Sequence, residues 1–103
     1  MESPKLRLSR LRDIGFRHWD PIGLLTEGET WDHKPFANEY DGYLREVAGL
    51  LRQGDREEVA VEMLVRAEVE YMGLGEGRRI DAERRAKLTV AAIQKDADLW
   101  SPD

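Results

Sequence analysis

The sequence contains no cysteine, which excludes a disulfide framework and any chemistry that needs a thiol. It also has no long apolar run, so no segment is expected to span a membrane. Its first residues, Met1-Glu2-Ser3-Pro4, lack the apolar stretch of a signal peptide. A chain of 103 residues has the length of one domain. We therefore expect a single helical domain, residues 1–103, in the cytoplasm.

An excess of basic residues is missing as well. The net charge is −5, and residues 39–76 hold ten acidic residues against four arginines. Binding to nucleic acid through phosphates needs a concentrated basic surface, so this balance argues against it as the main function. A weak nucleic-acid contact through residues 78–87, which carry four arginines and a lysine, stays open as an alternative.

Groups for covalent catalysis are few. The three serines lie near the ends of the chain, and none has the strand-turn-helix surroundings of a nucleophile elbow. A metal-dependent or carboxylate-based hydrolase is an alternative if the polar residues of segment 18–41 converge, namely His18, Asp20, Asp32, His33, Glu39 and Asp41. No spacing puts two ligands on one helical face. We therefore assign no catalytic residue, metal ligand or cofactor.

The spacing of apolar residues predicts an all-α fold, a small bundle of about four helices with a long structured loop between the first two. The first helix is expected to begin at Ser3-Pro4 and to end near Phe16. The other three are expected from about Asn38 to Gln53, from Asp55 to Met72 and from Asp81 to about Leu99. The second is expected to have an apolar arc that includes Leu44 and Val47, and the third a core stripe that includes Ala60 and Leu64. Asp55 and Glu58 have the spacing of a capping box.

The predicted loop carries two tryptophans, Trp19 and Trp31. A loop with two indoles is expected to be packed against the domain. Asp20 precedes Pro21, which favours a turn that the Asp20 carboxylate caps. We hypothesise that Trp19 packs on Tyr40 and Tyr43; the simpler alternative is that Trp19 only fills one end of the core.

One acid lies at an apolar position. Glu68 projects between Leu64 and Met72 on the third predicted helix, where a buried carboxylate needs a partner. Arg45 or a loop amide is the expected partner, and a functional role is the alternative. The candidate binding residues are therefore Trp19, Asp20, Trp31, Tyr40, Asp41, Tyr43 and Glu68.

The fourth predicted helix has apolar residues on two sides. Leu88, Ala92 and Leu99 project opposite the expected core face, which includes Val90, Ile93, Ala97 and Trp100. Another part of the chain or a second molecule must cover that second side. A weak homodimer through Leu88, Ala92 and Leu99 is one expectation.

Two motifs carry a resemblance. Trp19-Asp20-Pro21-Ile22-Gly23, followed by Glu39-Tyr40-Asp41-Gly42-Tyr43 and later by Met72-Gly73-Leu74, resembles a group of small uncharacterised bacterial proteins. That group has a Trp-Asp-Pro-Ile-Gly segment and then Asp-Glu-Tyr-Asp-x-Tyr ahead of a helical hairpin; this chain departs from it at Asn38, where aspartate is more usual. The resemblance covers residues 8–75 and implies a helical fold, no defined activity and a hint of toxin-immunity functions. With these motifs, we expect a protein–protein interaction module, immunity-like or regulatory, that binds an unknown protein partner.

Overall fold

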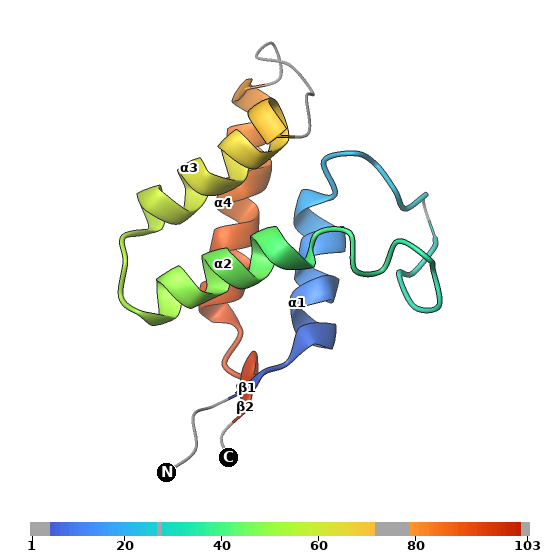
Figure 1. The fold of residues 1–103 in the computed structure, drawn as a ribbon, viewed down its shortest axis with the longest axis horizontal. Coiled ribbons are helices and arrows are strands. Elements are labelled where there is room, and N and C mark those ends of the chain that lie inside the picture. The colour runs from blue at the N-terminus through green and yellow to red at the C-terminus, as the bar shows by residue number, and fades with distance from the viewer. Residues whose placement is uncertain (1–4, 27, 72–78, 102–103) are drawn as a thin grey trace.

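The computed structural model describes residues 5–26, 28–71 and 79–101. Within them the chain is helical apart from one short strand pair, which confirms the predicted all-α class (Figure 1). The elements in order are β1 (Lys5–Leu6), α1 (Leu8–Ile14), η1 (Gly15–Trp19), α2 (Asp41–Arg52), α3 (Glu57–Arg66), η2 (Ala67–Tyr71), α4 (Arg79–Lys95) and β2 (Trp100–Ser101). Between η1 and α2, the described residues 20–26 and 28–40 form turns and bends.

The core lies along α4, which contacts α1, η1, α2, α3 and η2. In Figure 1, α4 passes behind α2 and α3, while α1 stands beside it. Eighteen apolar residues form one buried cluster: Leu11, Ile14, Phe16, Trp19, Tyr40, Leu44, Val47, Ala48, Ala60, Leu64, Val65, Ala67, Val69, Ala82, Ala86, Val90, Ile93 and Leu99. The clearest sequence pattern is thus confirmed, because the apolar arc of α2 and the stripe of α3 both point into this cluster.

The two ends of the described chain meet in an antiparallel ribbon. Leu6 pairs with Trp100, and Lys5 pairs with Ser101. The prediction that the first helix begins at Ser3-Pro4 is wrong for Lys5 and Leu6, which are extended; Ser3 and Pro4 lie outside the described residues. Strand pairing satisfies backbone groups that a helix turn would otherwise use, and a single-sequence pattern cannot foresee a partner so far away along the chain.

The fourth helix is shorter than predicted, since it ends at Lys95 rather than near Leu99. The Asp96 side chain accepts a hydrogen bond from the backbone N–H of Asp98 at 3.0 Å, which turns the chain out of the helix. Ala97, expected on the core face, is exposed, and Trp100 lies in β2, where the Arg52 guanidinium stands 4.6 Å from its ring centroid.

Because α4 ends at Lys95, the second apolar side that was predicted for this helix is not continuous. Leu99 is fully buried, Ala92 is half-buried against the core, and Leu88 is 51% exposed. The three residues therefore do not form one exposed stripe. The predicted homodimer surface through Leu88, Ala92 and Leu99 is wrong, because Leu99 follows the turn at Asp96 into the domain.

Helices α2 and α3 begin later than predicted, at Asp41 and Glu57. The predicted capping box is wrong: Arg56 is the N-cap of α3, and no side chain caps it. The expected connection of two residues, Gln53 and Gly54, is longer in the structure, where residues 53–56 join the helices and Gly54 at φ +90° allows the sharp turn. None of the helices that the structure describes is long and apolar enough to cross a bilayer.

Gly15, the first residue of η1, lies against Leu44 of α2. A Cβ at this position would overlap Cδ1 of Leu44, a buried side chain. We expect Gly15→Ala to destabilise the fold by about 1–3 kcal/mol, because the overlap outweighs the gain in helix propensity. Gly49, in α2, has open space around its Cα, so Gly49→Ala is the matched control and should stabilise by about 0.5–1 kcal/mol. Urea denaturation of both variants checks this pair, and equal effects would contradict it.

Arg10 of α1 holds the end of α4 through Asp96, with 2.8 Å between Nη2 and Oδ1. The hydrogen bond from Arg10 holds the pKa of Asp96 below its ordinary value of 3.8. Because the folded state then binds fewer protons, this stabilisation is present above about pH 4 and is lost as the pH falls through the folded pKa. We expect Asp96→Asn to be less stable than wild type at pH 7, and the difference to vanish near pH 2 in urea titrations. The control is Asp98→Asn, at an exposed position; a difference for Asp96→Asn that does not change with pH would contradict the assignment.

Candidate functional site

Trp19 is the last residue of the π-helical turn η1, and its side chain is 1% exposed. Its ring meets Tyr40 edge-on, with 5.2 Å between the centroids. The ring of Tyr43 lies 5.9 Å away at 70°. The prediction that Trp19 packs on both tyrosines is confirmed, and such edge-on aromatic pairs add stability beyond the area they bury.

Asp20 joins this aromatic contact to the following loop. Its carboxylate accepts the backbone N–H of Leu24 at 2.8 Å and of Leu25 at 3.1 Å, which confirms that it caps the turn after Pro21. The Tyr40 hydroxyl donates to the same carboxylate at 2.7 Å. Burial and this bond raise the pKa of Tyr40. We call Trp19, Asp20, Tyr40 and Tyr43 the Trp19 cluster.

Trp31 and Asp41 form a separate group with α1. Arg12 donates two hydrogen bonds to the Asp41 carboxylate, at 3.1 and 2.7 Å, and this pairing raises the pKa of Arg12. The same guanidinium lies 5.4 Å from the centroid of the Trp31 ring, whose N–H donates to Asp13 at 2.7 Å. Both residues therefore attach the loop and the start of α2 to α1.

Phe16 is the core aromatic that sequence reasoning left unassigned. Its ring lies 5.2 Å from Tyr40 and 5.9 Å from Phe36, between the loop and the Trp19 cluster. At ideal helical spacing Phe16 falls off the face of Leu11 and Ile14. The π-helical turn beginning at Gly15 changes that direction, and no local propensity reveals such a turn.

Glu68 is fully buried in η2, as its apolar neighbours indicated. Arg85 of α4 donates to it, with 3.2 Å between Nε and Oε1 and a second contact from Nη2 to Oε2. The cation is therefore Arg85 and not the expected Arg45, since α4 lies directly against η2. These contacts place Glu68 in the packing of η2 on α4, separate from the described contacts of the Trp19 cluster.

The polar residues of segment 18–41 do not converge. In the part of the chain that the structure describes, no three His, Asp or Glu side chains gather so as to hold a metal ion. Asp20 is engaged by Tyr40 and the loop amides, and Asp41 by Arg12. His33, Asp32 and Glu39 are exposed. The shared metal or carboxylate site considered from the sequence is therefore not formed.

The basic stretch 79–87 is largely neutralised by acids of the same domain. Arg79 pairs with Glu62 at 2.9 Å, and Arg84 pairs with Asp81 at 2.9 Å. Arg85 is committed to Glu68. Paired arginines offer less charge to phosphates, so the structure adds no support for nucleic-acid contact here. Arg78 lies outside the described residues.

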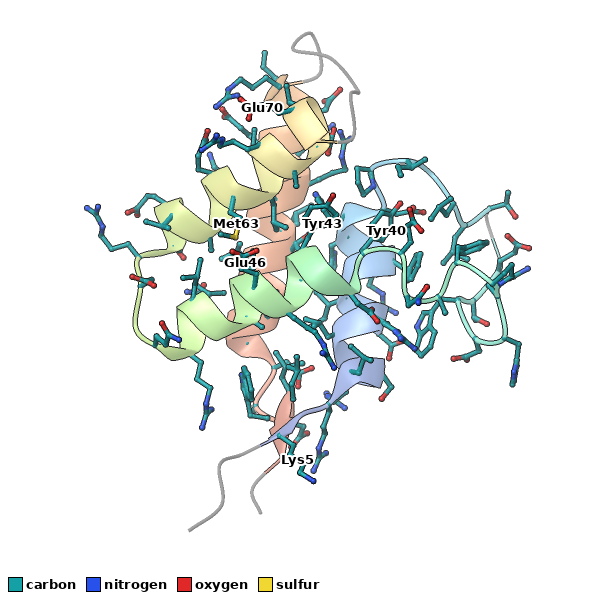
Figure 2. The ribbon with its side chains drawn as sticks, viewed as in Figure 1. Lys5, Tyr40, Tyr43, Glu46, Met63 and Glu70 are labelled. Carbon is teal, nitrogen blue, oxygen red and sulfur yellow. The ribbon has the colours of Figure 1, made fainter. Side chains whose placement is uncertain are left out.

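A groove of about 470 Å³ lies between α2 and α3. Tyr43, Val59 and Met63 form its apolar part, and its rim carries Glu46, Glu58, Glu62 and Arg66. Figure 2 shows Tyr43 and Glu46 of α2 and Met63 of α3 between the two helices. We call this set the α2–α3 groove. In the sequence, Val59 and Met63 lie one helical turn apart, next to the glutamates Glu58 and Glu62. This pattern alone indicates only that the edge of an apolar core meets a solvated helix face.

In comparisons with known proteins, no family model matches the chain, and no match is found among the curated proteins or the solved structures. The resemblance to small bacterial proteins therefore stays a prediction, and the later segment that adds to it, Met72-Gly73-Leu74, lies outside the described residues. Function has to be inferred from the geometry of the chain itself.

Proposed function

We propose that the chain is a protein–protein interaction module that binds a positively charged amphipathic helix of a partner protein in the α2–α3 groove. The observation that carries this proposal is an apolar depression surrounded mainly by carboxylates. An immunity-like or regulatory role in the cytoplasm is part of the same proposal, since such proteins act by binding another protein.

The floor of the groove supports a docking role. Val59 is 41% exposed, and Tyr43 and Met63 are half-buried, so all three have apolar surface available to a partner. Methionine adapts its shape to different apolar partners, and tyrosine contributes large rigid contacts in interfaces. A groove between two helices suits a third helix with apolar anchors at i, i+3, i+4 and i+7.

The rim selects the charge of that helix. Glu46 is exposed and has no ion pair among the described residues, and the nearest cation to Glu58 is Arg56 at 4.0 Å, with both side chains mostly exposed. Glu62 shares Arg79, and Arg66 is the one basic group on the rim among the described residues. Glu46, Glu58 and Glu62 therefore outnumber Arg66 on the rim, and this acidic balance attracts cationic partners and repels acidic ones.

The Trp19 cluster gives the groove a fixed wall. Tyr43 contacts Trp19 and also lines the groove, so the buried indole limits the rotation of this ring. An interface whose contact residues are already in place loses less conformational entropy on binding. The cluster therefore acts as a positioning element for the proposed interface.

A pair of synthetic peptides tests this proposal. A Leu/Lys amphipathic helix of about 18 residues should bind the wild-type protein in calorimetry, and its Leu/Glu counterpart should not. Met63→Ser should weaken the Leu/Lys peptide about tenfold or more, because an apolar anchor loses its contact. Leu88→Ser removes a more exposed apolar side chain on α4, away from the groove, and should leave binding unchanged.

The role of charge is tested with the double variant Glu46→Lys and Glu58→Lys. This variant should bind the Leu/Lys peptide more weakly than the wild-type protein does, and it should bind the Leu/Glu peptide. Equal binding of both peptides to wild type, or equal effects of Met63→Ser and Leu88→Ser, would overturn the proposal.

A further inference from the structure

A second hollow is lined by residues of α1, of η1 and of the loop residues 25–26 and 29–31. Its volume is about 640 Å³, within the range of about 300–1,000 Å³ typical of small-molecule pockets. Its apolar wall is formed by Ile14, Phe16, Leu25 and Trp31. None of these residues lines the α2–α3 groove, so the hollow is independent of the proposed protein interface.

Most acidic groups of the hollow already have donors. Asp20 accepts two loop amides and the Tyr40 hydroxyl. Both oxygens of Asp96 accept from Arg10. Glu29 accepts Lys34 at 2.6 Å and the Thr26 amide at 3.0 Å, and the Lys34 bond lowers the pKa of Glu29 to about 2. The acceptors on this surface are therefore largely used up by the protein itself.

The remaining groups are donors. Arg17 and His18, adjacent in η1, both line the hollow, and neither has a hydrogen bond or ion pair within the described part of the chain. The Thr30 hydroxyl, on the facing loop, is likewise without a described partner. Burial and the neighbouring Arg17 lower the pKa of His18, so its imidazole is neutral at pH 7 and can donate one hydrogen bond. A ligand that fits this surface must bring acceptors.

The charge of the hollow limits how negative that ligand can be. Asp13 and Asp20 are hydrogen-bonded to Trp31 and Tyr40, which are neutral, so their charges are not cancelled by a described ion pair. Arg17 is the one cation of the hollow without a described acid partner. A single negative charge can meet Arg17, whereas a dianion such as phosphate would be repelled by the two nearby carboxylates.

We propose that this hollow binds a small organic monocarboxylate with a flat apolar body. The carboxylate accepts from Arg17, with His18 and Thr30 as further donors, and the apolar body contacts Trp31 and Phe16. The indole N–H of Trp31 is held by Asp13 at 2.7 Å, so the ring is fixed before a ligand arrives. The π-helical turn η1 supplies the geometry, since it presents Arg17 and His18 together; such turns recur at functional sites.

Phenylacetate is the probe, and the readout is the indole N–H resonance of Trp31 in a ¹H–¹⁵N correlation spectrum, assigned with Trp31→Phe. The resonance should move saturably with phenylacetate. It should not move with phenylacetamide, the neutral isostere, or with inorganic phosphate. Arg17→Gln should weaken phenylacetate about tenfold or more, the loss expected for one charge-assisted hydrogen bond.

Arg45→Gln is the matched control, because it removes the same charge from an exposed arginine that does not line the hollow. It should leave phenylacetate binding unchanged. Three results would overturn the proposal. The first is no movement at about 10 mM, where a ligand with a dissociation constant of about 1 mM is about 90% bound. The second is an equal response to phenylacetamide or phosphate, and the third is an equal effect of Arg17→Gln and Arg45→Gln.

Discussion

Trp19→Ala is expected to lower the free energy of unfolding by about 3–5 kcal/mol, the range for truncating a buried large aromatic side chain. Trp19 is 1% exposed and contacts both tyrosines of the Trp19 cluster. Its removal leaves a cavity beneath the start of α2 and releases the Tyr43 ring from one side. A urea titration at neutral pH measures the change.

Trp19→Phe separates packing from hydrogen bonding. The indole N–H of Trp19 is buried and has no hydrogen-bond partner among the described residues, so we expect Trp19 to stabilise the fold by packing. Phenylalanine keeps most of the ring and removes the unpartnered N–H, so it should cost much less than alanine. Should Trp19→Ala cost under about 1 kcal/mol, the aromatic contact does not stabilise the fold and the cluster is not its organising element.

Arg85→Ala is the second large effect, with an expected loss of about 3–5 kcal/mol. Glu68 is fully buried, and the Arg85 side chain is 23% exposed, so the substitution removes both Arg85 contacts from a buried carboxylate. The Thr89 hydroxyl donates to the Arg85 backbone carbonyl at 2.7 Å; this bond remains in the variant and keeps the helix turn comparable.

The control for this pair is the double change Glu68→Leu with Arg85→Met. It removes both charges and fills similar volume, so it should cost clearly less than Arg85→Ala alone. A double variant that is no more stable than Arg85→Ala would contradict this account, because removing the buried charge would then recover no stability.

Sequence reasoning succeeded where the signal was periodic. The apolar arc through Leu44 and Val47 predicted the buried face of α2, and the stripe through Ala60 and Leu64 predicted that of α3. These patterns work because a regular helix places every third or fourth residue on one side. Asp20 before Pro21 was equally informative, since both residues restrict the backbone locally.

Prediction from the sequence failed where a residue far away along the chain determines the local structure. Lys5 and Leu6 are extended because Trp100 and Ser101 pair with them, and Leu99 is buried because Asp96 turns the chain. Gly15, where the π-helical turn begins, lies against Leu44 of another helix. None of these causes lies within a window of neighbouring residues, so no propensity could report them.

The contacts of the candidate site also fall into those that local patterns predict and those that depend on distant residues. The contacts of Trp19, Asp20, Tyr40 and Tyr43 followed from two short motifs. The partner of Glu68 did not follow, because naming Arg85 requires knowing that η2 lies against α4. The α2–α3 groove was also not evident, since it depends on how far apart the two helices stand and not on either helix alone.

Amide hydrogen exchange at Leu24 and Leu25 tests most directly whether the Trp19 cluster organises the chain. Both residues lie in a segment without helix or strand, and their N–H groups are bound by the Asp20 carboxylate. We predict that both amides exchange far more slowly than in an unstructured peptide, and that Trp19→Ala removes this protection under conditions where α4 stays protected. Exchange at the free-peptide rate in the wild-type protein would contradict the account.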